Sequence, residues 1–348
     1  MNPFMLFLML SSLTAGTLIT LTSTHWLMAW MGLEINTFAI LPLMTQKYHP
    51  RAMEATTKYF IIQTTAATML LFAATSNAWM TGQWEIQQMN NTLPLAIITL
   101  ALMLKMGLAP LHPWFPEVLQ GLNFSTEKIL STWQKLAPFS LMLQISSFNS
   151  TLLIIFGLIS ILVGGWGGLN QPQLRKVLGY SSIAHLGWMI LVMQYSPNLA
   201  FLTFIIYAIL TFSMFLTFMF NQTTTINMLS LSSTKIPTLS AIIPLTLLSL
   251  GGLPPLTGFL PKWLILAELT KQDMMVAATV AALSALLSLY FYLRLSYAMT
   301  LYISPNNLPA MLPWRLTSIQ NTTPLAISTT LSLLLLPIMP SALAFVFH

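Results

Sequence analysis

Charged side chains inside long apolar runs are the residues of this sequence that could carry out chemistry. Four stand out: Glu34, Lys105, Lys135 and Lys262. A charge within a membrane-spanning segment costs about 2.5–3.5 kcal/mol on insertion scales, and as a rule it faces the interior of the protein. Burial disfavours the charged form of such a group, whereas a nearby opposite charge favours it. A changing distance between a glutamate and a lysine can therefore release or take up protons.

Lysine suits such a switch better than arginine, because the guanidinium group stays protonated in proteins. A row of such groups can relay protons, so all four residues are candidates for a functional role. Structural roles are open beside this one. Glu34 could serve only as the charge partner of a lysine. Lys262 lies near the end of its apolar run and could extend toward the membrane surface.

Two histidines are candidate relay residues, because imidazole titrates near neutral pH. His112 follows Lys105 along the chain, and His185 lies in an apolar run of the second half. The ordinary alternative for both is a hydrogen-bonded packing role. Glu54 and Lys58 are four residues apart, which predicts an ordinary ion pair on a helix surface.

Proline interrupts two apolar runs close to these lysines, around residues 105–116 and around residues 251–262. The prolines concerned are Pro110, Pro113, Pro254 and Pro255. Proline removes a backbone donor and clashes with the preceding turn, so each run is expected to form a broken helix. Broken backbone at membrane depth is tolerated only where protein or a polar cavity satisfies the freed groups. Interrupted helices in corresponding halves of a chain point to a transport site.

The composition is that of a membrane protein. Hydrophobic residues make up 56% and charged residues only 6% of the chain, against roughly 25% charged in soluble domains. Eleven apolar runs of about 20 residues predict an all-α polytopic protein with about eleven transmembrane helices. The runs are 4–22, 26–45, 58–79, 93–111, 125–146, 151–169, 177–194, 199–220, 239–268, 275–299 and 323–346.

Several function classes are excluded or lack support. The chain has no cysteine, which rules out disulfides, thiol catalysis and iron–sulfur ligation by cysteine. No glycine-rich loop follows a predicted strand, so no nucleotide-binding fold is indicated. The histidines are isolated, which does not favour a metal site. The net charge of +6 is scattered along the chain and does not indicate nucleic-acid binding.

The two interruptions resemble each other in sequence. Gly107-Leu108-x-Pro110-Leu111-x-x-Trp114-x-Pro116 returns as Gly252-Leu253-x-Pro255-Leu256-x-x-Phe259-x-Pro261. They lie on the fourth and ninth apolar runs, which are five crossings apart. Because successive crossings alternate in direction, an odd number of crossings means that the two helices run in opposite directions. We therefore expect two inverted five-helix repeats, at 1–148 and 149–302, each with one broken helix. A C-terminal loop and helix at 303–348 would follow.

Basic residues gather in the loops after the second, sixth, eighth and tenth runs. They are Lys47, Arg51, Lys58, Arg175, Lys176, Lys235 and Arg315. Basic loops stay on the side of the membrane from which insertion occurs. This predicts an N-terminus on the inner side and, with an odd number of crossings, His348 on the outer side.

Several motifs together are similar to those of the antiporter-like subunits of respiratory complex I. They are Met31-Gly32-Leu33-Glu34-Ile35-Asn36, residues 105–116, residues 173–187 and residues 251–263. The resemblance covers essentially the whole chain, and its Met-rich, cysteine-free composition resembles that of mitochondrial members. It implies two inverted repeats with broken helices, and it assigns the proton-carrying positions of the family to Glu34, Lys105, Lys135 and Lys262.

The resemblance implies a core membrane-arm subunit that pumps protons across the mitochondrial inner membrane during electron transfer from NADH to ubiquinone. Protons would pass from Glu34 and Lys105 through Lys135 toward Lys262. The enzyme activity would belong to the complex; NADH, FMN, iron–sulfur clusters and ubiquinone would bind elsewhere in it. Expected partners are other membrane-arm subunits, core and accessory, and phospholipids including cardiolipin. The N-terminus would face the matrix and the C-terminus the intermembrane space.

Two other functions are open at this point. The chain could be a stand-alone cation/proton antiporter, for which sodium-dependent transport by the isolated subunit would be evidence. It could also be a non-conducting structural subunit whose lysines no longer carry protons.

Overall fold

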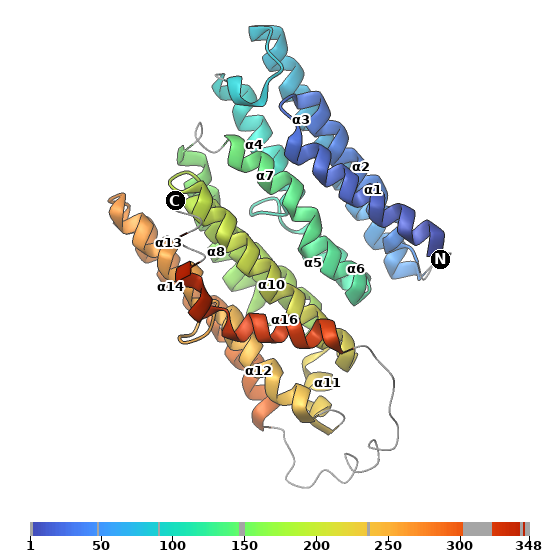
Figure 1. The fold of residues 1–348 in the computed structure, drawn as a ribbon, viewed down its shortest axis with the longest axis vertical. Coiled ribbons are helices and arrows are strands. Elements are labelled where there is room, and N and C mark those ends of the chain that lie inside the picture. The colour runs from blue at the N-terminus through green and yellow to red at the C-terminus, as the bar shows by residue number, and fades with distance from the viewer. Residues whose placement is uncertain are drawn as a thin grey trace. The chain divides into compact units, whose positions relative to one another are not determined.

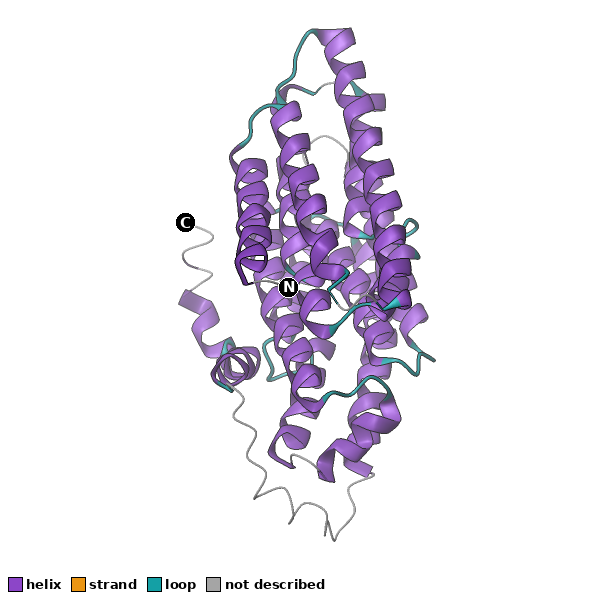
Figure 2. Ribbon diagram, turned by 90° about the vertical axis from the view of Figure 1, so that its right-hand side faces the viewer, coloured by secondary structure: helices purple, strands orange, loops and turns teal. Residues whose placement is uncertain are grey.

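The computed structural model describes residues 3–46, 49–89, 91–145, 150–234, 237–301, 322–341 and 344. Helices make up nearly all of this part of the chain, and none of its residues belongs to an extended sheet (Figure 2). The all-α fold class is thereby confirmed. Lys47, Lys235, Arg315 and His348 lie outside the described residues, so the predictions that involve them stay predictions.

The chain divides into two compact units, residues 1–159 and 160–348 (Figure 1). The first unit contains α1 (Pro3–Thr22), α2 (Trp26–Met44), α3 (Pro50–Thr81), η1 (Ile86–Gln88), α4 (Thr92–Met106), α5 (Trp114–Gly121), α6 (Phe124–Ser131), η2 (Trp133–Lys135) and α7 (Leu136–Ile145). Helix α8 (Ser150–Gly168) crosses the boundary between the units. The predicted boundary at residues 148 and 149 stays a prediction.

The second unit contains the remaining helices of the described chain. They are α9 (Leu174–Met193), α10 (Pro197–Asn221), α11 (Ile226–Ser230), η3 (Leu231–Thr234), α12 (Pro237–Gly251), α13 (Phe259–Lys271), α14 (Met275–Leu301), α16 (Thr323–Leu334) and η5 (Leu336–Ile338). Within this unit, α9 packs against α10, α13 and α14.

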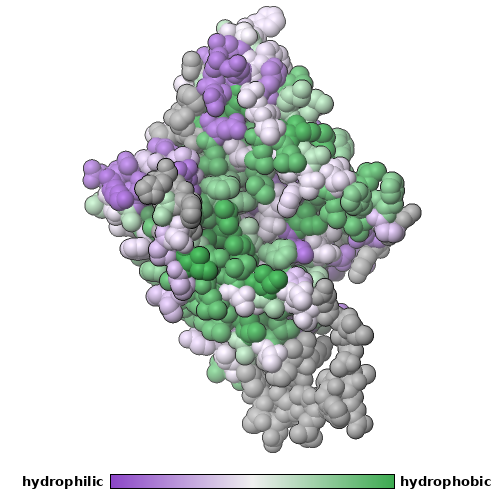
Figure 3. Space-filling view, in the orientation of Figure 1, coloured by the Kyte–Doolittle hydropathy of each residue, from purple (hydrophilic) through white to green (hydrophobic). Residues whose placement is uncertain are grey.

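Length and composition suit seven of the described helices to crossing a membrane, and three shorter helices are also apolar. The predicted total of eleven crossings is not confirmed by this count. The predicted eleventh crossing contains α16, which has 12 residues and extends for only about 18 Å at 1.5 Å per residue. Apolar side chains cover much of the surface in Figure 3, which suits a protein surrounded by lipid and by apolar partner surfaces.

The predicted crossing at residues 125–146 is not one continuous helix. It consists of α6, the 3₁₀ turn η2 and α7. Pro138 explains the interruption, because it lacks the amide hydrogen that would bond to the carbonyl of Gln134 and its ring clashes with that carbonyl. Lys135 is thus placed at a bend between two helices.

Small residues allow α1 and α2 to approach closely. A Cβ atom added at Gly16 would lie 2.9 Å from the carbonyl oxygen of Gly32, and one added at Gly32 would lie 2.9 Å from the carbonyl oxygen of Gly16. Glycine pairs of this kind are common at helix contacts in membranes. The close approach fixes the position of α2, which carries Glu34 and Asn36.

Both predicted helix breaks are present, and their backbones are built alike. Helix α4 ends at a left-handed glycine, Gly107 (φ 77°), and α12 at Gly252 (φ 79°). The amide of Leu108 donates to the carbonyl of Met103 across the first break, and the amide of Leu253 donates to that of Leu248 across the second. Each is the terminal hydrogen bond of a Schellman motif. A cis proline peptide follows at Ala109–Pro110 and at Pro254–Pro255.

A second backbone feature also occurs once in each unit. Just before α2, His25 forms a β-bridge with Glu85, which follows α3; just before α9, Gln173 forms one with Thr225, which follows α10. The amide of Trp26 donates to the carbonyl of Trp84 in the first bridge, and the amide of Leu174 donates to that of Thr224 in the second. The matched bridges and breaks are what an internal repeat of five crossings would produce.

Candidate functional site

Lys105 lies at the first break, two residues before Gly107, and is only 7% exposed. Its backbone carbonyl is among those left without an intrahelical partner where α4 ends. Gln63 of α3 donates to this carbonyl from its amide nitrogen at 3.3 Å. The broken backbone is therefore satisfied by protein, and the lysine is held at the interruption.

A cavity within the first unit is lined by both Lys105 and Lys135. Its volume is about 20 Å³, measured as the space open to the centre of a water molecule. The lining comes from helices α2 to α7 and comprises Leu33, Asn36, Thr37, Tyr59, Gln63, Lys105, Met106, Trp114, Phe115, Leu130, Gln134, Lys135 and Pro138. A cavity of this volume with several polar groups suits a water molecule.

Buried polar atoms without protein partners line this cavity. Within the described residues, neither the side-chain oxygen nor the nitrogen of Asn36 has a hydrogen-bond partner, and the same holds for Nζ of Lys105. Such atoms carry a large desolvation cost unless something satisfies them. The arrangement thus favours a hydrated connection over a dry packing contact.

Lys135 is 2% exposed and lies at the other side of the same cavity. Its Nζ is 4.4 Å from the centroid of the Phe115 ring, a cation–π contact with the short helix that follows the first break. The neighbouring Gln134 donates to the backbone carbonyl of Asn36 at 3.1 Å. This hydrogen bond joins η2, which carries Lys135, to α2 at the cavity.

Glu34 is partly buried and lies on α2 between the cavity-lining residues Leu33 and Asn36. The hydroxyl of Thr37 donates to its carboxylate at 3.0 Å. Glu34 is near enough to Lys105 for a coulombic interaction, but Nζ of Lys105 has no hydrogen-bond partner among the described residues. The glutamate and the lysine are therefore close enough to influence each other without being paired.

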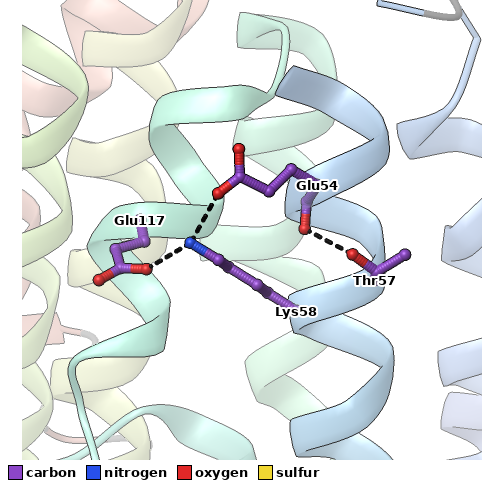
Figure 4. Close-up of polar contacts among 4 residues, drawn as sticks. All are labelled: Glu54, Thr57, Lys58 and Glu117. Carbon is purple, nitrogen blue, oxygen red and sulfur yellow. Dashed lines mark hydrogen bonds and ion pairs between the residues drawn. The ribbon is translucent and has the colours of Figure 1, made fainter. Parts of the chain in front are cut away.

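An ion-pair cluster at the surface connects α3 to α5 (Figure 4). Lys58 contacts Glu54 at 2.8 Å and Glu117 at 2.9 Å. The predicted pair between Glu54 and Lys58 is confirmed, whereas the contact with Glu117 was not foreseen. Glu117 lies in the first turn of α5, so the cluster fixes the helix that carries Phe115.

In the second unit, Lys262 reaches back across the second break. Its Nζ donates to the carbonyl of Gly251, the last residue of α12, at 2.7 Å. A positive group at a helix C-terminus satisfies a free carbonyl and complements the helix dipole. The side chain is partly buried and points inward, so the interpretation as a lysine extending to the membrane surface does not fit its contacts.

Lys262 also lines a second cavity of about 20 Å³, together with His185, Trp188, Met189, Thr203, Ile206, Tyr207, Leu210, Gly258, Pro261 and Ile265. The rings of His185 and Tyr207 lie 5.6 Å apart. Of the two candidate relay histidines, His185 thus shares a cavity with a lysine. His112 is half-buried and is not among the residues that line the first cavity.

The sequence interpretation missed several polar residues that line the first cavity, including Asn36, Tyr59, Gln63 and Gln134. Asn36 and Gln134 are adjacent or nearly adjacent to assigned residues, so a closer reading of their motifs could have suggested them. Tyr59 and Gln63 are not close in sequence to any residue assigned a proton-carrying role, so no motif pointed to them. No group of three or more potential metal ligands occurs in the part of the chain that the structure describes.

Comparison with known proteins gives a family for this arrangement. Residues 23–288 match the model of the NADH:quinone oxidoreductase/Mrp antiporter transmembrane family, and residues 289–343 match that of the NADH dehydrogenase subunit 2 C-terminus. The NADH-ubiquinone oxidoreductase chain 2 of Tetraodon nigroviridis is 64% identical over 99% of both chains. That of Gadus morhua is 63% identical over 99% of both.

A solved structure gives the same result. A chain of respiratory complex I from Thermus thermophilus with bound aureothin has a TM-score of 0.80 and 26% identity, over 97% of this chain and 80% of that chain. The chain therefore belongs to the NADH:quinone oxidoreductase/Mrp antiporter transmembrane family, within its NADH-ubiquinone oxidoreductase chain 2 branch.

Proposed function

We propose that this chain is a membrane-arm subunit of respiratory complex I and takes part in proton translocation across the mitochondrial inner membrane. Translocation is coupled to electron transfer from NADH to ubiquinone, for which the cofactors bind elsewhere in the complex. Family membership and the similarity to complex I subunits support the assignment. The observation that carries the proton-handling role is the cavity shared by the buried lysines Lys105 and Lys135.

The first unit has the parts of a proton relay. Glu34 lies close enough to act electrostatically on Lys105, so a change in the position or protonation of the glutamate changes how readily Lys105 holds a proton. A water molecule in the cavity, bound by the amide of Asn36, then connects Lys105 to Lys135. The cation–π contact with Phe115 holds the Lys135 side chain at this cavity.

In the second unit, Lys262 and His185 form a separate candidate relay around their own cavity. Histidine can accept a proton at one ring nitrogen and donate one from the other. Tyr207, whose ring contacts His185, supplies a further hydroxyl in the same cavity. His112 is proposed as a relay only on its position after Lys105.

The surroundings of the chain follow from the same assignment. Its partners are other membrane-arm subunits, both core and accessory, and phospholipids including cardiolipin. The many exposed apolar side chains, such as Phe72 and Leu93, suit such neighbours. By the distribution of basic loops, the N-terminus faces the matrix and the C-terminus the intermembrane space.

The test is the variant Lys135→Met in the intact complex reconstituted into liposomes. Methionine keeps the length and apolar stem of lysine but cannot carry a proton. The expected result is normal assembly with a lower ratio of protons pumped to electrons transferred. Lys271→Met is the matched control, because Lys271 has a side chain 72% exposed. An unchanged proton-to-electron ratio in Lys135→Met would count against the proposed role and favour a structural subunit.

A further inference from the structure

A buried hydrogen bond joins the loop of the second helix break to the C-terminal helix α16. The hydroxyl of Thr257 donates to the backbone carbonyl of Ser332 at 2.5 Å, and the two residues are 1% and 0% exposed. We propose that Thr257 is a positioning residue for Lys262: by tying this loop to α16, it holds the lysine in the place where it carries protons. The proposal rests on the proposed function of Lys262 as a proton carrier.

The end of α16 supplies the acceptor. Ser332 lies two residues before Leu334, the last residue of α16, and the last four carbonyls of a helix lack partners within it. A buried carbonyl without a partner is costly, and the threonine hydroxyl removes this cost. Helix α16 packs against α10 and α12, so the hydrogen bond attaches the loop to a helix that two other helices hold in place.

The same loop meets the elements that carry Lys262. Thr257 precedes Gly258, which is the N-cap of α13 and lines the second cavity together with Lys262. A Cβ atom added at Gly258 would overlap the carbonyl oxygen of Ser249 in α12, so the backbone beside Thr257 lies directly against α12. A displacement of Thr257 would therefore move both the start of α13 and one wall of the cavity.

The position of the Lys262 side chain depends on the geometry of this loop. Its Nζ donates to the carbonyl of Gly251 at 2.7 Å, and its Cδ would lie only 2.9 Å from a Cβ atom added at Gly252. The side chain thus runs from α13 back over the first residues of the loop to the end of α12. This contact requires that the two ends of the loop keep their separation, and Thr257 fixes the end that leads into α13.

The first break has a titratable residue at the corresponding position. In the repeated pattern, Thr257 corresponds to His112. Imidazole titrates near neutral pH, whereas a threonine hydroxyl does not. What Thr257 contributes in the structure is its hydrogen bond to α16, which supports a positioning role in the second break.

The experiment compares variants of the intact complex in liposomes. Thr257→Val keeps the branched shape of threonine but lacks the hydroxyl, whereas Thr257→Ser keeps the hydroxyl. Thr246→Val is the matched control, because Thr246 is 0% exposed and its hydroxyl donates within α12, to the carbonyl of Ile243 at 2.9 Å. Two quantities are measured for each variant: the ratio of protons pumped to electrons transferred, and the amide hydrogen exchange of residues 251–262.

The loss of one hydrogen bond should make local opening of the loop roughly two- to tenfold more frequent. Thr257→Val is therefore expected to exchange the amides of residues 251–262 faster by that factor and to pump fewer protons per electron. Thr257→Ser should resemble the wild type in both measurements, because its hydroxyl can donate to the same carbonyl. Thr246→Val should also leave both unchanged.

The proposal is overturned if Thr257→Val keeps the wild-type proton-to-electron ratio, because the hydrogen bond then only fastens α16. It is also overturned if amide exchange in Thr257→Val is unchanged, if Thr257→Ser does not restore the ratio, or if Thr246→Val lowers the ratio equally. If Thr257→Val does not assemble, Thr257→Cys takes its place, because a thiol is a weaker donor than a hydroxyl. Equal pumping by the cysteine and serine variants would then count against the proposal.

Lys262→Met is measured alongside to separate this proposal from the one on which it rests. If Lys262→Met pumps with a normal ratio, the proposed proton-carrying function of Lys262 fails. If Lys262→Met is impaired while Thr257→Val is not, only the positioning role of Thr257 fails.

Discussion

The side-chain nitrogen of Lys262 lies 2.7 Å from the carbonyl oxygen of Gly251, so a residue after the second helix break closes the helix before it. The first break is closed differently. There Gln63, on another helix, donates to the carbonyl of Lys105, and the lysine side chain is left to face the cavity. The two breaks share a backbone motif, but their lysines occupy different sides of it.

This contact gives Lys262 two separable tasks, capping α12 and holding a proton. Lys262→Met should lose both: the free carbonyl costs about 1–3 kcal/mol of stability, and the protonatable group is gone. Lys262→Arg should keep a charged donor but not a releasable proton. We therefore expect the arginine variant to recover the thermal midpoint of the purified complex without recovering its proton-to-electron ratio. If arginine restores pumping as well, Lys262 acts only as a cap.

Gly107 gives a second prediction, because it occupies left-handed backbone with φ of 77°. An alanine there costs about 1–2 kcal/mol from conformation alone. Its Cβ would also lie 3.2 Å from Cβ of Phe115, whose ring contacts Lys135. Gly107→Ala should therefore lower both the thermal midpoint of the complex and its rate of proton pumping.

Gly82 is a matched control for this change. It has a similar φ of 73°, but a Cβ added there would meet nothing within 4 Å. Gly82→Ala should show the conformational loss of stability alone, with normal pumping. Equal effects of the two substitutions on pumping would show that the contact with Phe115 does not matter for Lys135.

The features predicted from sequence were those that a short stretch encodes. Prolines within the repeated Gly-Leu-x-Pro-Leu pattern, which starts at Gly107 and at Gly252, located both breaks, because the penalty for proline inside a helix is local. The apolar runs located most helices, because hydrophobicity along a run of about 20 residues is also a local property of the sequence. Lys105 and Lys135 were singled out because a charge within an apolar run is costly to insert into a membrane, whichever way the helix packs.

Features that depend on packing between distant segments were not predictable in this way. Lys58 and Glu117 are 59 positions apart, and nothing in either local sequence indicates that α5 folds back against α3. Glu127 lies in the polar stretch Ser125-Thr126-Glu127-Lys128, which is typical of a span end at the membrane surface. Only the packing of α6 shows that this carboxylate is buried.

The Lys58 cluster gives a further prediction that separates a tertiary ion pair from a local one. Glu54 lies one turn from Lys58 on the same helix, whereas Glu117 belongs to α5. Glu117→Gln should therefore loosen the attachment of α5, which carries Phe115 to Lys135, and lower the rate of proton pumping at low ionic strength. Glu54→Gln should leave pumping unchanged, because it removes only a contact within α3.

The ionic strength gives a second test of the same ion pair. Exposed pairs are screened by salt, so raising the ionic strength should lower the pumping rate of the wild type toward that of Glu117→Gln. A difference between these two that persists at high salt would show that Glu117 acts through something other than its charge.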